Sequence, residues 1–452
     1  MPLASQTIDV KRFIDDRRFS PYQWLVIALC FLILTVDAYD IAAIGYAAPS
    51  LIGEWHIAKA QLGGAMSAGV LGMTAGALLG GAVSDWSSPK RVLIIMMMTS
   101  AIGSFLTAFA GSMTVLAGLR FITGVGLGAA MPVALTIVYE YTPTRRGPLL
   151  VNFVNCGVML GAAACGLVAA ALIPAFGWES IFVIGGVVPL VLAVVSIFVL
   201  PEPLRFMVSR GWPSERVAAV MRRIAPDTSF DGAHFVISED VETQQKRGVS
   251  VILSRGFRFG TLMLWCAYFC AAFVFYLLNG WMPLLLRGSG ITTSQASFIT
   301  SLFSLGGVAG TLCLGWLMGR FEKNGVVAIA VAGGALTLWL LGEQQGNLML
   351  LAVCTFAAGV CVNGAVMSMA ALAASFYPTS GRATGVSWMT GMGRFGGMLG
   401  PAAGGLMLKF NLDVSTVFTL LAAPMLIQAV ALWLKRSATD ASAAVEYPSN
   451  LA

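Results

Sequence analysis

The feature that most constrains this chain is a series of twelve long apolar runs. Most are about 18 to 25 residues long, the length that a helix needs to cross a ~30 Å hydrocarbon core. Only 11% of the residues are charged, whereas soluble domains carry roughly 25%. The sequence therefore predicts an all-α polytopic membrane protein with twelve transmembrane helices. The runs lie at 22–47, 60–84, 91–110, 113–139, 147–172, 179–200, 258–286, 295–319, 325–342, 347–376, 383–408 and 414–434.

The distribution of basic residues predicts how these helices are oriented. With the N-terminus placed inside, 22 of the 27 Lys and Arg residues fall on the cytoplasmic side and only three fall outside. The remaining two, Arg120 and Arg394, lie within predicted helices. Because cytoplasmic loops of membrane proteins carry such an excess of Lys and Arg, we expect both termini in the cytoplasm. The net charge of +6 is explained in this way and does not indicate a nucleic-acid partner.

A long polar segment, 201–257, separates six runs from six runs. We expect it to be a cytoplasmic linker with one or two surface helices, between an N-terminal bundle at 1–200 and a C-terminal bundle at 258–452. No phosphate-binding GxxxxGK[ST] loop occurs in the sequence, which disfavours transport driven by ATP.

The two halves carry a faint internal repeat. Phe121 and Gly124 recur 235 residues later as Phe356 and Gly359. Duplicated six-helix units are typical of secondary transporters, which hold their substrate near the membrane midplane between the two halves. By analogy with that fold we expect a monomer.

Two carboxylates lie well inside the first run, in the segment LTVDAYDIAAIGY. The spacing of three places Asp37 and Asp40 on nearly one helix face, where each charge costs roughly 2.5–3.5 kcal/mol. Under the functional interpretation they couple transport to protons, because such a group can load a proton on one side and release it on the other. Under the structural interpretation they form a salt-bridged or helix-capping pair. His56 and His234 are the chain's two histidines and lie in predicted loops, which leaves carboxylates as the proton carriers.

Two arginines also lie within predicted helices. Arg394, in MTGMGRFGGMLGP, offers a planar fork for a carboxylate. Two interpretations stay open, an anchor for an anionic substrate and the partner of a buried acid such as Asp37 or Asp40, and both can hold in different states. Arg120, near the start of the fourth run, has a coupling or a structural role rather than direct substrate contact.

Aromatic and amide side chains complete the candidate site. Tyr39 flanks the acidic pair, and Tyr276 and Trp281 lie in the aromatic-rich seventh run. Most such rings belong to cores or interface belts, but those facing a cavity can stack on a planar ligand. Asn152, Asn155 and Asn279 are candidate hydrogen-bonding groups in a cavity. No nucleophile–base pair, metal-ligating cluster or nucleotide loop is present, so we predict no catalytic residue, metal or cofactor.

One loop resembles a known signature. The segment GGAVSDWSSPKR resembles G-x-x-x-D-R-x-G-R-K, the loop signature of the major facilitator superfamily. Its Gly81, Asp85, Lys90 and Arg91 match, whereas Trp86, Ser88 and Pro89 depart from the pattern. The segment RFITGVGLGAAMP, centred on Arg120, resembles a second superfamily signature.

Within that superfamily the chain is most similar to the aromatic acid:proton symporters. That family shows D-G-x-D followed by G-x-x-x-P, and DAYDIAAIGYAAPSL keeps Asp37, Asp40, Gly45 and Pro49 with Ala38 replacing Gly. The segments IPAFGWESIFVIGGVVPL, WMPLLL and YPTSGRATGVSWMTGMGRFGGMLGP also look like this family. The resemblance covers roughly 20–435.

The resemblance implies proton-driven import of an aromatic carboxylate, such as a benzoate or hydroxybenzoate, across the inner membrane. It assigns proton coupling to Asp37 and Asp40, a substrate-binding role to Arg394 and gating to Asp85. We group further residues with each role as expectations. The substrate group adds Tyr39, Asn155, Trp281 and Tyr276, and the gating group adds Arg91, Arg120, Glu140 and Arg145.

Two other functions remain as alternatives. The first is a proton-coupled exporter of drugs or aromatic metabolites on the same fold. Proton antiporters of the superfamily usually carry a Gly-Pro motif in helix five, where this chain reads NCGVMLGAAACG without proline. The second is a membrane chemosensor, which the short linker and C-terminal tail disfavour because they leave no room for a sizeable signalling domain.

Overall fold

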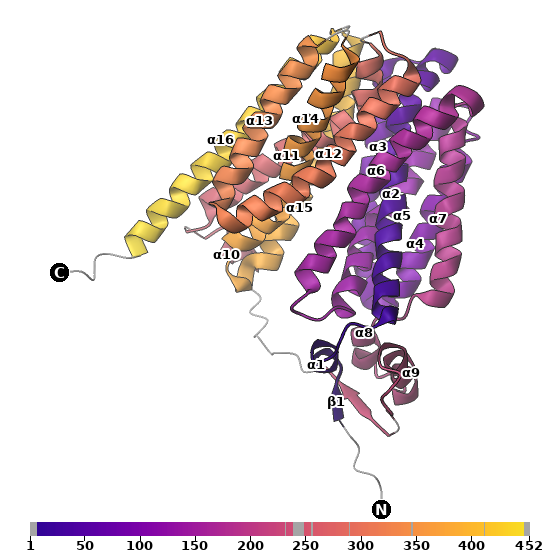
Figure 1. Ribbon diagram of the computed structural model, residues 1–452, viewed down its shortest axis with the longest axis vertical. Coiled ribbons are helices and arrows are strands. Elements are labelled where there is room, and N and C mark those ends of the chain that lie inside the picture. The colour runs from indigo at the N-terminus through magenta and orange to yellow at the C-terminus, as the bar shows by residue number, and fades with distance from the viewer. Residues whose placement is uncertain are drawn as a thin grey trace, which may run out of the picture.

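The computed structural model describes residues 7–446, apart from 231, 238–247, 255, 289, 345–346 and 411; the side chains of 81–82, 84–86, 148, 248, 379–380, 383 and 437–446 are also outside the description. Twelve long helices form two bundles of six (Figure 1). The first bundle contains α2 (Pro21–Trp55), α3 (Lys59–Trp86), α4 (Pro89–Thr107), α5 (Met113–Glu140), α6 (Gly147–Phe176) and α7 (Glu179–Val199). The second contains α11 (Arg258–Arg287), α12 (Thr293–Arg320), α13 (Lys323–Glu343), α14 (Leu348–Phe376), α15 (Thr379–Lys409) and α16 (Val414–Glu446).

These helices confirm the predicted all-α membrane fold. Within the described ranges, eleven helices are long and apolar enough to span a membrane. The twelfth long helix, α15, falls short because polar residues, among them Arg394, interrupt its apolar sequence. An arginine is retained inside a membrane helix only where it faces protein or a water-filled space, so Arg394 indicates that α15 faces such a space.

Helix α2 shows how local chemistry sets the helix boundaries. It begins after Ser20, whose hydroxyl accepts the Gln23 N–H at 3.3 Å while the Gln23 side chain accepts the Ser20 N–H at 2.8 Å. The helix ends at Trp55, later than the predicted 47, because it continues through Pro49. Proline is tolerated in membrane helices because neighbouring groups satisfy the backbone that it leaves unpaired.

The faint sequence repeat corresponds to a repeated helix contact. A Cβ atom on Gly124 of α5 would lie 2.1 Å from the Gly69 carbonyl oxygen of α3. In the second bundle, a Cβ on Gly359 of α14 would lie 2.0 Å from the Phe303 carbonyl oxygen of α12. Small residues allow this close approach of membrane helices, and the two bundles use them at matching positions.

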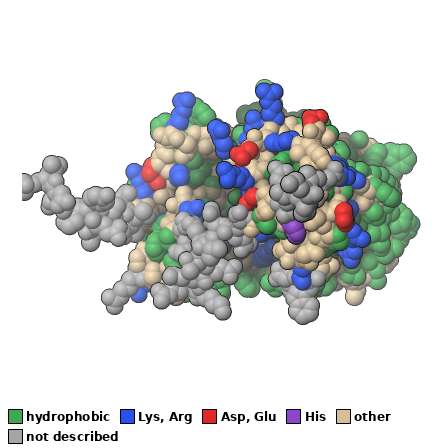
Figure 2. Space-filling view, turned by 90° about the horizontal axis from the view of Figure 1, so that it is seen from below, with side chains coloured by type: hydrophobic (Ala, Val, Ile, Leu, Met, Phe, Trp, Pro, Cys, Tyr) green, Lys and Arg blue, Asp and Glu red, His purple; other side chains and the backbone are tan. Residues whose placement is uncertain are grey.

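Short elements of the N-terminal arm and the linker pack at one end of the first bundle, and we call this group the cap. It consists of β1 (Thr7–Asp9), α1 (Val10–Asp15), α8 (Leu204–Ser209), α9 (Ser214–Ile224) and β2 (His234–Val236). Strands β1 and β2 pair in parallel, a pairing that the sequence did not predict. Lys and Arg side chains are spread over this end of the molecule (Figure 2). The last linker helix, α10 (Gly248–Ile252), instead contacts α15 of the second bundle.

At the end away from the cap the two bundles are held together, and we call this contact the far-end seal. Arg287 of α11 donates to the Pro49 carbonyl of α2 at 3.3 Å, and Ser294 of α12 donates to the Ala170 carbonyl of α6 at 2.7 Å. A Cβ on Gly45 would lie 2.5 Å from the Asn279 carbonyl oxygen. The ribbons of the bundles diverge from this seal toward the cap (Figure 1).

Candidate functional site

A cavity of about 230 Å³, which we call the main cavity, lies between the two bundles. It is lined by seven helices, α2, α3, α5, α6, α11, α14 and α15. A side chamber of about 50 Å³ adjoins it and extends to Asp40 and Arg120. Most of the lining of this main cavity is apolar. Its polar side chains are Thr74, Tyr268, Tyr276, Asn279, Thr390 and Arg394.

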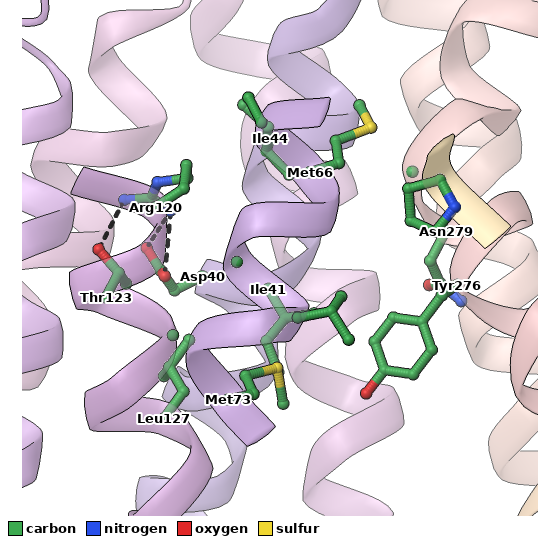
Figure 3. A pocket seen from close by; sticks show the side chains of 16 residues that line it. Asp40, Ile41, Ile44, Met66, Met73, Arg120, Thr123, Leu127, Tyr276 and Asn279 are labelled. Carbon is green, nitrogen blue, oxygen red and sulfur yellow. Dashed lines mark hydrogen bonds and ion pairs between the residues drawn. The ribbon is translucent and has the colours of Figure 1, made fainter. Parts of the chain in front are cut away.

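The side chamber contains a buried ion pair. The guanidinium Nη1 of Arg120 lies 3.2 Å from Oδ2 of Asp40, and the two side chains are 4% and 2% exposed. Figure 3 shows the pair on one side of the chamber, opposite Tyr276 and Asn279 of α11. Removing one member of a buried pair costs about 3–5 kcal/mol, because the other charge is left uncompensated.

Hydroxyl groups complete the surroundings of this ion pair. The Ser104 hydroxyl of α4 donates to Asp40. Nη2 of Arg120 donates to Thr107 at 2.7 Å and to Thr123 at 3.1 Å. The Asp40 carboxylate therefore has two partners from two different helices, and three helices, α2, α4 and α5, meet at one charge cluster.

Asp37 lies one turn before Asp40 on α2 and has a different environment. Its side chain is 7% exposed, and its Oδ2 atom is buried without a hydrogen-bond partner in the described structure. No described Lys or Arg lies within ion-pair distance of it. Because burying an unpaired carboxylate is costly, this position suits a neutral, protonated acid.

Arg394 does not pair with either acid. It is half-buried on α15, and its Nη1 donates to the Met73 carbonyl of α3, in the other bundle, at 2.9 Å. Within the described ranges, no carboxylate forms a salt bridge with it. The sequence left open a pairing of Arg394 with Asp37 or Asp40. In the structure Asp40 instead pairs with Arg120, and the Arg394 guanidinium faces the main cavity.

Two tyrosines of α11 lie beside this arginine. Glycines on both sides of it make room for their rings, since a Cβ on Gly393 would lie 2.4 Å from Tyr268 and one on Gly397 would lie 2.8 Å from Tyr276. The aromatic rings and the guanidinium thus line one cavity wall. A cation beside aromatic faces can hold the acidic group and the ring of an aromatic acid together.

Of the five predicted substrate-binding residues, Arg394 and Tyr276 line the main cavity, and three do not. The Tyr39 hydroxyl donates to the Ile181 carbonyl at 3.2 Å, and the fully buried Trp281 indole donates to Pro401 at 2.9 Å. Asn155 is partly buried on α6. The helical turn of 100° per residue separates Tyr39 from Asp40 and Trp281 from Tyr276, so residues close in sequence have different surroundings here.

The four gate residues whose side chains the structure describes lie in different places. Arg120 lies with Asp40 inside the bundle, apart from the loop residues with which the sequence grouped it. Glu140 accepts the Arg205 backbone N–H of α8 at 3.3 Å, and Arg145 is exposed in the loop before α6. Arg91 is exposed at the start of α4. The side chain of Asp85 lies outside the described residues.

Sequence reasoning missed the hydroxyls around the ion pair. Thr123 follows Arg120 by three residues, so helical spacing alone predicts their contact. Ser104 and Thr107 lie on a different helix, and no local pattern links them to Asp40 or Arg120. The Met73 carbonyl that holds Arg394 is a backbone group and leaves no sequence signal.

Comparison with known proteins relates this arrangement to a family. The family profile described as Major Facilitator Superfamily matches residues 30–261 and 264–450. The 4-hydroxybenzoate transporter PcaK of Pseudomonas aeruginosa is 43% identical over 440 residues, covering 97% of this chain and 98% of that protein. A gallate transporter of Pseudomonas putida is 41% identical over 431 residues, covering 95% of this chain and 96% of that protein.

A solved structure has the same fold. The xylose transporter XylE from E. coli, in an inward-open conformation, superimposes with a TM-score of 0.70 at 15% identity, covering 91% of this chain and 95% of that one. At this identity the likeness concerns the arrangement of the helices.

Proposed function

Because this chain belongs to the major facilitator superfamily of membrane transporters, we propose that it imports an aromatic carboxylate, of the benzoate or hydroxybenzoate class, together with protons. It is a transporter and not an enzyme. The observation that carries the proposal is Arg394, a cavity-lining guanidinium beside two tyrosine rings and without a carboxylate partner in the described structure. Relatives at 43% and 41% identity named for 4-hydroxybenzoate and gallate support the substrate class.

In this proposal Arg394 binds the substrate carboxylate. Guanidinium has five N–H donors, and the structure records one hydrogen bond from it, to Met73. The remaining donors suit a bidentate carboxylate, a charge-assisted interaction worth roughly 1.5–3 kcal/mol. Tyr268 and Tyr276 contact the aromatic ring.

Asp37 and Asp40 carry the coupled protons. A proton on Asp40 weakens its bond to Arg120, and deprotonation restores the pair, so the pair has two arrangements that a proton can select. Asp37, buried without a partner one turn away, accepts or passes on a proton in the same bundle. Both acids come from α2, which also lines the main cavity through Ala38, Ile41 and Ala42.

We further propose that the cap faces the cytoplasm, with both termini on that side of the cell inner membrane. The basic side chains at the cap end support this orientation (Figure 2). The far-end seal then closes the outer side, and the described conformation is the one that releases substrate inward. The units 1–200, 201–257 and 258–452 act as two rocking bundles and their linker in a monomer, with Asp85, Arg91, Glu140 and Arg145 near the inner opening.

Purified protein in proteoliposomes tests the proposal. Labelled 4-hydroxybenzoate and benzoate are supplied outside with an inward proton gradient, an inside-negative potential, both or neither. We expect accumulation with the proton gradient and abolition by a protonophore. Uptake that ignores both gradients contradicts proton symport, and accumulation that requires the reversed gradient favours the exporter alternative.

A further inference from the structure

The main cavity and the side chamber meet at a short shared wall. Six residues line both spaces, and only Asn279 among them carries an amide; the other five are Ile41, Val70, Met73, Leu127 and Tyr276. Arg394 lines only the main cavity. A planar acid whose carboxylate is bound by Arg394 therefore directs its opposite edge toward the side chamber and Asn279.

The hydrogen bonding of Asn279 fixes which end of its amide is available. Its Nδ2 donates to the Phe275 carbonyl at 2.8 Å, and a carbonyl oxygen requires a donor, so nitrogen must occupy that side. The Oδ1 atom then faces away from its own helix, and the described structure records no donor to it. Asn279 thus presents a hydrogen-bond acceptor to the cavity.

The position of Asn279 also ties it to the seal. Its backbone carbonyl is the atom closest to Gly45, where α2 and α11 meet at the far-end seal. A ligand bonded to the Asn279 side chain therefore lies next to this contact between α2 and α11. Figure 3 shows Asn279 and Tyr276 on the opposite side of the chamber from Asp40 and Arg120.

We propose that Asn279 accepts a hydrogen bond from a ring hydroxyl of the substrate, opposite the carboxylate bound by Arg394. This inference rests on the proposed function and adds a specificity-determining residue to it. A ring hydroxyl is a donor and satisfies Oδ1, whereas an unsubstituted ring leaves that acceptor unpaired when water is displaced. Sites that hydrogen-bond a substrate hydroxyl discriminate strongly against analogues that lack it.

Binding of benzoate and of 2-, 3- and 4-hydroxybenzoate to the purified full chain, measured by isothermal titration, tests this assignment. We expect Asn279→Leu to weaken 4-hydroxybenzoate binding about tenfold, the size of one ordinary hydrogen bond, and to leave benzoate within about twofold. The loss decreases from the 4- to the 2-hydroxy isomer, because the hydroxyl moves away from Asn279.

Asn152→Leu is the matched control, since Asn152 is an exposed amide on α6 that lines neither cavity, and we expect it to change no affinity. Asn279→Ala provides the same comparison if the leucine variant does not fold. Equal losses for benzoate and 4-hydroxybenzoate, or an unchanged ratio, overturn the inference alone. Wild-type protein that binds none of these acids overturns the proposed function and this inference with it.

Discussion

The two bundles share a scaffold but differ in the chemistry inside it. Gly161 packs against Thr35 in the first bundle as Gly396 packs against Phe269 in the second, so α2 and α6 correspond to α11 and α15 at this contact. By this correspondence and that of Gly124 with Gly359, Asp40 and Arg120 of the first bundle match Val274 and Thr355 of the second. Conversely, Arg394 of the second bundle corresponds to Met159 of the first.

The difference indicates a division of labour. The first bundle encloses a charge pair that is neutral as a whole and nearly sealed from solvent. The second presents an arginine to the main cavity without an acidic partner in the described ranges. The charge pair of the first bundle can take up and release a proton, and the arginine of the second bundle can bind an anion. The pair and the arginine line adjoining spaces. Exchanging the corresponding residues between bundles tests this account.

The largest effect is expected from Arg120→Thr, which copies Thr355. It leaves Asp40 buried without its cation, and we expect a loss of about 3–5 kcal/mol in unfolding free energy and no transport. The double variant Asp40→Val with Arg120→Thr copies the second bundle and removes both charges, so most of the stability returns while proton-driven uptake stays absent. Chemical unfolding in detergent and proteoliposome uptake measure the two outcomes, and a double variant that still accumulates substrate contradicts the assignment.

Arg394→Met, which copies Met159, tests the second bundle. Removing the charge-assisted bonds is expected to weaken binding of benzoate and 4-hydroxybenzoate alike by roughly 10- to 100-fold, with little change in unfolding midpoint because the side chain is only half-buried. Arg382→Met, an exposed arginine on the same helix, serves as the control and retains wild-type affinity. Unimpaired binding in Arg394→Met is incompatible with an anionic anchor there.

Gly45→Val tests the seal where the two bundles meet. Its Cβ would lie 2.5 Å from the Asn279 oxygen, and such overpacking costs roughly 1–3 kcal/mol. We expect faster hydrogen exchange in the outer ends of α2 and α11 and at least about fivefold slower uptake. Gly53→Val on the same helix is the control, because no atom lies within 4 Å of the added Cβ. We expect it to leave hydrogen exchange and the uptake rate unchanged. Similar behaviour of the two variants contradicts the far-end seal.

The smallest effect concerns the first turn of α13. Glu322 accepts N–H bonds from Asn324 and Gly325 and lies 3.5 Å from Arg436; despite partial burial, these donors lower the pKa of Glu322. Ser88 holds the corresponding position at α4. A lowered pKa contributes stability above the unfolded value of 4.5 that is lost as pH falls through the folded value.

We therefore expect Glu322→Gln to destabilise the protein slightly at neutral pH, by about 0.5 kcal/mol or less because the group is exposed to solvent. The difference from wild type disappears as the pH falls below the lowered pKa of Glu322. Unfolding midpoints measured across this pH range check the trend, and a difference that grows toward acid pH has the wrong sign for this cause.

Hydropathy predicts eleven of the long helices strongly and α15 more weakly, because the bilayer fixes both the length and the apolar composition of a spanning helix. It failed at boundaries such as that of α2, which continues through Pro49 to Trp55. The cap strands were unpredictable, since each has three residues and pairs with a segment more than 200 residues away.

The sequence predicted which residue types form the site, but it predicted only some of their interaction partners. Membrane burial singled out Asp37, Asp40, Arg120 and Arg394, because charges there need a reason. The pairing of Asp40 with Arg120, 80 residues apart, depends on how α2, α4 and α5 pack, and a single sequence does not contain that information. Tyr39 and Trp281 were chosen for their chemistry but face other neighbours.

The most direct test of the division of labour compares counterflow with accumulation in the same proteoliposomes. Counterflow of labelled 4-hydroxybenzoate against unlabelled internal substrate requires binding and rocking but no proton gradient, whereas accumulation requires proton coupling. We predict that Asp37→Asn retains counterflow and loses proton-driven accumulation, while Arg394→Met loses both. Accumulation that persists in Asp37→Asn, or counterflow that persists in Arg394→Met, would contradict the assignment of protons to the first bundle and the anion to the second.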